Sequence, residues 1–138
     1  MKTARTPAPA PEACPCGSGL PLAACCGRYL GTGVPAPDAE RLMRSRYTAF
    51  VRGDVDHLLT TWHPSTRPRS LDLEPGVKWL GLAVRQHRAL GPDDAEVEFV
   101  ARSRLAGRAS RLHERSRFVR EGGQWYYVDG DLFTKDRA

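Results

Sequence analysis

The sequence predicts an α+β fold in which two helices precede four antiparallel strands. Apolar residues recur at helical spacing between residues 38 and 62, and they alternate with polar residues at a period of two from residue 77 onward. Short turns, most of them containing glycine, divide the alternating part into four runs. Helices followed by a meander of strands pack as two layers, so we expect both helices on one face of the sheet.

The two helices have recognisable ends. Asp38 follows Pro37 and suits the N-cap of the first helix, and Gly53 suits its C-terminal stop. Asp54 is the expected cap of the second helix, which Pro64 ends because the residue before a proline avoids the α conformation. The apolar faces consist of Leu42, Met43, Tyr47, Phe50 and Val51 in the first helix, and of Val55, Leu58, Leu59 and Trp62 in the second.

Four strands are expected over residues 77–90, 95–105, 109–120 and 124–129. The connections at 91–94, 106–108 and 122–123 are short, and the Gly122-Gly123 pair is typical of a two-residue hairpin turn. The sheet is therefore predicted to be an antiparallel meander.

Composition indicates one domain with a small N-terminal appendage. The chain has 138 residues, 41% of them hydrophobic, and it contains no run of the ~20 apolar residues that cross a bilayer. Residues 1–13 are rich in alanine and proline and predict a disordered tail, 14–30 form a cysteine segment, and 31–138 form the α+β domain. The tail lacks the apolar stretch of a secretory signal, so a cytoplasmic protein without membrane contact is expected.

Four cysteines, Cys14, Cys16, Cys25 and Cys26, form the strongest chemical signal. In a reducing cytosol such a cluster predicts metal ligands more readily than disulfides, and four thiolates suit one structural zinc ion. Gly17 and Gly19 allow a tight turn between the ligand pairs. Two disulfides or free thiols are the alternatives, although a bridge between adjacent cysteines would strain the peptide between them.

These motifs resemble a known family. Cys-Pro-Cys-Gly-Ser-Gly at 14–19 followed by Cys-Cys-Gly at 25–27 resembles the SEC-C motif. The motifs at 26–30, 42–47, 61–64, 79–82, 114–118 and 124–130 resemble the YchJ family of small bacterial proteins, and the similarity covers nearly all of residues 13–131. It implies a nuclear-transport-factor-2-like (NTF2-like) domain, in which a curved sheet wraps around helices to form a cone with a pocket. The resemblance implies no particular activity, because none is established for the family.

The resemblance also has a departure that bears on partners. SEC-C motifs that bind partners carry lysines before the second cysteine pair, whereas residues 20–24 have no charge in this chain. An acidic partner is therefore not expected at this stretch.

A cone pocket would make an enzyme or a small-molecule binding protein conceivable. Strand alternation places Trp79, His87, Val97, Phe99, Leu112, Glu114, Ser116 and Phe118 on one face. The candidate pocket residues are His87, Glu114, Tyr47, Tyr127 and Arg44. The interpretation that we favour is structural, with Glu114 paired to Arg44 as a buried link.

The opposite face of the sheet carries a row of arginines: Arg102, Arg104, Arg111, Arg115 and Arg117. With a net charge of +5, such a basic stripe could contact the phosphates of RNA or of the ribosome. Glu96 and Glu98 share this face, so a solvated mixed-charge surface is the alternative.

The sequence thus supports three hypotheses on function. The first is a non-catalytic zinc-binding adaptor that presents Leu20, Leu22 and Tyr29 of the knuckle to an unidentified protein partner. The second is a small-molecule binding protein or enzyme that uses the cone pocket. The third is an RNA or ribosome contact through the arginine stripe.

Overall fold

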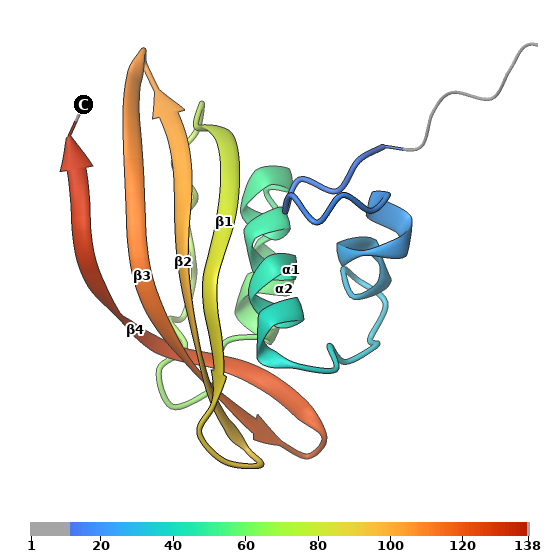
Figure 1. Ribbon diagram of the computed structural model, residues 1–138. Coiled ribbons are helices and arrows are strands. Elements are labelled where there is room, and N and C mark those ends of the chain that lie inside the picture. The colour runs from blue at the N-terminus through green and yellow to red at the C-terminus, as the bar shows by residue number, and fades with distance from the viewer. Residues whose placement is uncertain (1–11, 138) are drawn as a thin grey trace, which may run out of the picture.

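The computed structural model describes residues 12–137 in three layers (Figure 1). A sheet of β1 (Lys78–Ala89), β2 (Asp94–Leu105), β3 (Arg108–Glu121) and β4 (Gln124–Arg137) forms the first layer. Helices α1 (Ala39–Arg52) and α2 (Val55–Thr60) form the second. The third is the cysteine segment with two short 3₁₀ turns, η1 (Leu22–Ala24) and η2 (Cys26–Arg28), which lies on the side of α1 away from the sheet (Figure 1).

The tail expected over residues 1–13 lies outside the described residues, apart from its last two. Glu12 accepts a backbone hydrogen bond from Leu22 at 2.8 Å, and Ala13 forms an antiparallel bridge with Pro21. The chain is therefore already paired with the cysteine segment from residue 12.

The predicted caps of both helices are confirmed. The Asp38 side chain accepts a hydrogen bond from the Arg41 backbone at 2.8 Å, and Gly53 ends α1 with a φ of 71°. Asp54 caps α2 by accepting from the backbone N–H of His57. The expectation that α2 reaches Trp62 is wrong, because the chain leaves the helix at Thr61 to bridge β4 through hydrogen bonds with Tyr127.

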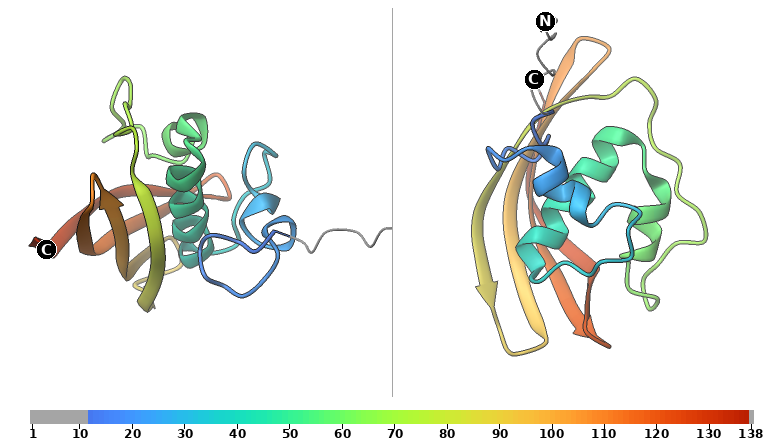
Figure 2. Two further views of the ribbon diagram at one scale, coloured as in Figure 1. Left: turned by 90° about the horizontal axis from the view of Figure 1, so that it is seen from above. Right: turned by 90° about the vertical axis from the view of Figure 1, so that its right-hand side faces the viewer.

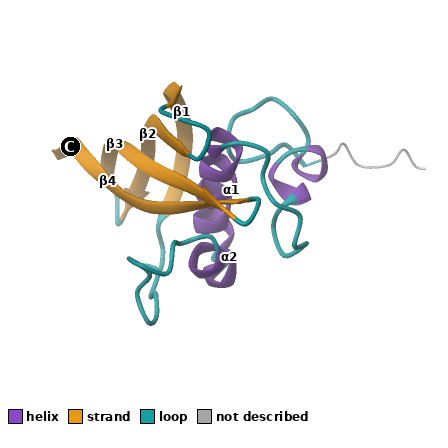
Figure 3. Ribbon diagram, turned by 90° about the horizontal axis from the view of Figure 1, so that it is seen from below, coloured by secondary structure: helices purple, strands orange, loops and turns teal. Residues whose placement is uncertain are grey.

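The four strands form the predicted antiparallel meander, in the order β1-β2-β3-β4. Bulges after Trp79 and after Val84 shift the register of β1 twice, so that His87 faces the helices as expected. The strand expected over 124–129 in fact continues to Arg137, because β3 provides pairing partners as far as Ser110. The long strands curve around α1 (Figures 2 and 3).

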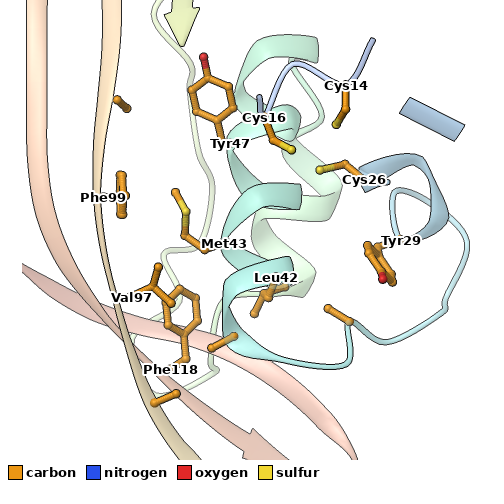
Figure 4. Close-up of a cluster of buried hydrophobic side chains, with 14 residues drawn as sticks. Cys14, Cys16, Cys26, Tyr29, Leu42, Met43, Tyr47, Val97, Phe99 and Phe118 are labelled. Atoms are coloured by element: carbon orange, nitrogen blue, oxygen red, sulfur yellow. The ribbon is translucent and has the colours of Figure 1, made fainter. Parts of the chain in front are cut away.

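Helix α1 is buried on two sides (Figure 4). Met43 points towards Val97, Phe99 and Phe118 of the sheet, which are among the buried residues of the core. On the other side of α1 lie the buried cysteines and Tyr29 (Figure 4). The helix therefore joins two differently built halves of the molecule.

No helix among residues 12–137 combines the length and the apolar character needed to span a bilayer.

Candidate functional site

The four cysteines meet in one cluster beside α1. Their Sγ atoms all lie within 4.8 Å of one another, and Cys16 and Cys25 are 3.6 Å apart, so none forms a disulfide. Cys14, Cys16 and Cys26 are buried, and Cys25 is partly exposed. Three thiols thus face the protein interior and one faces the surface.

Glycines shape the backbone of the cluster. Gly17 and Gly19 have φ values of 79° and 85°, in the left-handed region that glycine adopts without strain. At Gly27 the reason is different, since a Cβ there would lie 2.7 Å from the carbonyl oxygen of Leu22. Close approach of the two 3₁₀ turns therefore excludes a side chain immediately after the second cysteine pair.

Polar groups from the loop and from α1 surround the sulfur atoms. Ser18 donates a hydrogen bond to Cys25 Sγ at 3.1 Å, and Thr48 Oγ1 lies 3.7 Å from Cys14 Sγ. Arg44 Nη1 donates to the Cys16 carbonyl oxygen at 2.9 Å and lies 3.8 Å from Cys16 Sγ. Donors around the sulfurs stabilise thiolates, the form in which cysteine binds metals.

The thiols also influence one another's ionisation. The hydrogen bond with the Cys26 thiol lowers the pKa of Cys16, while the same contact and burial raise the pKa of Cys26. Of these two thiols, Cys16 is therefore the one that ionises more readily.

This arrangement could hold one metal ion. A zinc–sulfur bond of about 2.3 Å implies a separation of about 3.8 Å between sulfurs at the corners of a tetrahedron. The observed separations, 3.6 Å for one pair and at most 4.8 Å for all, are close to that value. The donor set of four cysteines, three of them buried, fits a closed structural site.

The predicted pocket residues divide between two places. Glu114, Tyr47 and Tyr127 line a chamber of about 240 Å³ between α1 and the sheet. His87 lies elsewhere, 3.8 Å from Glu40 at the start of α1. Arg44 points to the cysteine cluster and pairs with Glu40 at 3.0 Å, so the expected Arg44–Glu114 link is wrong.

The arginine of the chamber is Arg46, which sequence reasoning did not single out. The sequence did contain evidence for Arg46, because it follows helical spacing with Met43, Tyr47 and Phe50. All four residues line the chamber. Arg44, one position outside this stripe, faces the knuckle instead.

The five arginines of the stripe share the outer face of the sheet, as the register of β2 and β3 requires. Arg115 and Arg117 meet carboxylates there. Arg117 pairs with Asp129 at 2.6 Å and Asp131 at 2.7 Å, and Arg115 lies 3.9 Å from Glu98. The hydrogen bond from Arg117 lowers the pKa of Asp131. This face therefore carries mixed charge rather than a continuous basic stripe.

The proposed docking residues of the knuckle differ in accessibility. Leu20 is 50% exposed, whereas Leu22 is half-buried and Tyr29 is only 8% exposed within the core. Tyr29 is therefore wrong as a docking residue, because its ring supports the knuckle from inside.

Comparison with known proteins agrees with both parts of the structure. Residues 38–130 match the family described as YchJ, middle NTF2-like domain, and residues 11–28 match the SEC-C motif. A UPF0225 protein of Methylibium petroleiphilum is 64% identical over 124 residues, which cover 89% of this chain and 90% of the relative. A UPF0225 protein of Chromobacterium violaceum is 59% identical over 124 residues, covering 86% and 91%.

Two solved structures share the fold. The solution structure of a SEC-C motif containing protein from Rhodopseudomonas palustris has a TM-score of 0.78 and 34% identity, over 88% of this chain and 98% of that one. The crystal structure of a SEC-C motif containing protein from Psychrobacter arcticus has a TM-score of 0.72 and 28% identity, over 88% and 82%. The chain belongs to the YchJ (UPF0225) family, in which it joins a SEC-C motif to an NTF2-like domain.

Proposed function

We propose that this protein is a non-catalytic adaptor in which Cys14, Cys16, Cys25 and Cys26 hold one structural zinc ion. The observation that carries the proposal is the cluster of four Sγ atoms within 4.8 Å of one another. Four thiolates complete the tetrahedral coordination of zinc and leave no position for water or substrate, which favours a structural role.

The ion would fix the knuckle against α1. Thr48 and Arg44 of α1 contact the cysteine segment, and the backbone of Glu12 and Ala13 closes it from the other end. The apolar contacts of this segment are chiefly those of Tyr29 and of the partly buried Leu22 and Leu30, and η1 buries no residue. Metal binding would therefore supply the stability that a small hydrophobic core lacks.

A hollow beside the ion is the surface we propose for the partner. Its volume is about 340 Å³, and Leu20, Ala24, Cys25, Arg28 and Arg41 are among its lining residues. Within residues 12–133, neither Arg28 nor Arg41 forms a side-chain ion pair. Asp38 and Glu40 line the same hollow, so it suits a protein segment that carries an apolar side chain flanked by groups of both charges.

The first experiment concerns the metal. Protein purified without added metal should contain one zinc per chain by elemental analysis, and Cys25→Ser should reduce that content. A zinc-free wild-type protein that keeps its fold would contradict the proposal.

The second experiment concerns the partner. Tagged protein should capture a partner from the lysate of its host in a manner that ribonuclease does not abolish, and Leu20→Ser should reduce capture while keeping full zinc content. Leu90→Ser is the matched control, since Leu90 is 54% exposed in a distant turn and Leu20 is 50% exposed. Capture that Leu20→Ser leaves unchanged would contradict the adaptor surface, and capture lost with ribonuclease would favour an RNA contact instead.

A further inference from the structure

The chamber between α1 and the sheet lies on the opposite side of α1 from the cysteine cluster. It has a volume of about 240 Å³ and is lined mostly by apolar side chains, among them Met43, Phe50, Phe99 and Leu112. A larger groove of about 720 Å³ shares three lining residues with the chamber: Phe50, Trp79 and Leu112. This groove therefore adjoins the chamber and is the route by which a ligand would enter it. A concave apolar site with few polar groups is the usual form of a small-molecule site.

Arg46 is the first unusual group in this chamber. The residue is only 6% exposed, and burial lowers its pKa to about 10. Its Nη1 donates to the Leu58 carbonyl oxygen and to Thr61 Oγ1, both at 2.7 Å. No carboxylate among the described side chains, those of residues 12–133, lies at ion-pair distance from it, although buried charges in proteins are usually paired.

The guanidinium of Arg46 is instead held by aromatic rings. It lies 4.6 Å from the ring centre of Tyr127 and 5.2 Å from that of Trp62. These cation–π contacts stabilise the charge without neutralising it. Trp62 Nε1 is buried and has no hydrogen-bond partner in the described part of the chain, as is also true of Trp125 Nε1 outside the chamber.

Glu114 is the second unusual group. Its carboxylate lines the same chamber and accepts a hydrogen bond from Ser116. Gly130 on β4 leaves room for it, since a Cβ at that position would overlap the carboxylate. Among the side chains of residues 12–133 it too has no cation at ion-pair distance, so the chamber contains one acceptor and one cation that do not satisfy each other.

A purely structural role explains only part of this arrangement. It accounts for the two hydrogen bonds by which Arg46 ties α1 to the end of α2. It leaves unexplained the volume beside Arg46 and a Glu114 without an ion-pair partner among residues 12–133. A bound molecule with both a donor and an acceptor would satisfy Glu114 and Arg46 together.

We infer that this chamber binds an uncharged small molecule with a compact apolar body and an amide-like polar end. The N–H of the ligand would donate to Glu114, and its carbonyl oxygen would accept from the guanidinium of Arg46. A charged ligand would be attracted by one of these two groups and repelled by the other, so neither sign of charge would offset the cost of its desolvation in an apolar site. The chamber is smaller than the sites that bind drug-sized ligands, so the apolar body of the ligand must be small.

Three probes of one shape test this inference on the zinc-loaded protein: benzamide, benzoate and benzylamine. Binding is read from the indole N–H signals in ¹H–¹⁵N spectra. Trp62 and Trp79 line the chamber, whereas Trp125 lines a separate hollow, so the third tryptophan is an internal control. We expect millimolar benzamide to shift the signals of Trp62 and Trp79 but not of Trp125, with benzoate and benzylamine at least about tenfold weaker.

The near-isosteric Glu114→Gln change then tests the pairing. It leaves Arg46 as the remaining charge, so benzoate should become the tightest of the three probes. Glu96→Gln on the outer face is the matched control and should keep the original order. The inference is overturned if benzamide does not bind at millimolar concentration, if the three probes bind alike, or if Glu114→Gln leaves their order unchanged.

Discussion

The two sides of α1 are stabilised in different ways. On the sheet side, Val97, Phe99 and Phe118 pack against the helix over long strands that bury apolar side chains along one face. On the knuckle side, the buried groups are chiefly cysteines and Tyr29 within a segment of tight turns. We therefore expect the NTF2-like domain to depend on apolar burial and the SEC-C segment to depend on an ion held by its cysteines.

Truncation of the sheet core should give the largest effect. Phe118 is among the largest fully buried side chains, so Phe118→Ala should lower the free energy of unfolding by about 3–5 kcal/mol. Denaturant unfolding followed by circular dichroism measures this change. Phe133→Ala is the control, because that ring is 44% exposed and its loss should cost below about 1 kcal/mol. Equal losses for both variants would contradict the assignment of the core.

The pH dependence of the free energy of unfolding should report on His57, which lies between the two helices, and not on the knuckle. Ser45 Oγ donates to the Leu42 carbonyl oxygen, so the His57 Nε2 at 2.9 Å must itself donate to Ser45. Burial lowers the pKa of His57 from 6.5 to about 4. The unfolded chain therefore takes up a proton first as the pH falls, and stability that is complete above pH 6.5 is lost towards pH 4.

The expected loss from His57 is about 3 kcal/mol between these pH values. His57→Gln should remove this part of the pH dependence, as measured by denaturant unfolding of both proteins across the range. Both proteins keep the four cysteines, so acid release of metal affects them alike and cancels in the difference. Parallel pH profiles would show that His57 is not held neutral in the folded protein.

A methyl group at Gly27 should weaken the knuckle without touching a ligand. The new Cβ would lie 2.7 Å from the Leu22 carbonyl oxygen and force the two turns apart, at a cost of about 1–3 kcal/mol. Zinc affinity, measured by competition with a chromophoric chelator, should fall by about 10- to 100-fold. Gly91→Ala is the matched control, since its Cβ would meet only Asp94 Oδ2 at 3.8 Å. Unchanged affinity in Gly27→Ala would argue against this close contact.

The smallest effect is expected at the cap of α1. Asp38→Ala removes the acceptor for the Arg41 backbone N–H and should cost about 1 kcal/mol, whereas Asp38→Asn should retain most of the stability. The midpoint of denaturant unfolding measures both. Identical midpoints for Asp38→Ala and the wild type would contradict the capping role.

Much of the fold follows from local patterns in the sequence. Asp38 and Gly53 mark the ends of α1, and alternation over β2 and β3 predicts which side chains face the helices. The extension of β4 beyond Gly130 could not be predicted in this way, because it depends on the pairing surface that β3 provides rather than on alternation in residues 130–137.

The candidate sites were predictable to a different degree. The cysteine spacing alone identifies the four clustered residues, since they lie within one short segment. The chamber combines residues of α1, Trp62 after α2 and residues of all four strands, so the sequence indicated Arg46 only through the helical spacing that it shares with Met43, Tyr47 and Phe50. Arg44 and Arg46 differ by two positions, and that difference places them on opposite sides of the helix.

Residue-resolved hydrogen exchange before and after chelation of the metal tests the central claim most directly. The amides of Cys14, Cys25 and Tyr29 donate hydrogen bonds within the knuckle, whereas those of β2 and β3 lie in the middle of the sheet. We predict that chelation removes the protection of the knuckle amides and leaves that of β2 and β3 in place. Loss of protection in both regions together, or in neither, would contradict the conclusion that the ligand cluster stabilises the knuckle while apolar burial stabilises the cone.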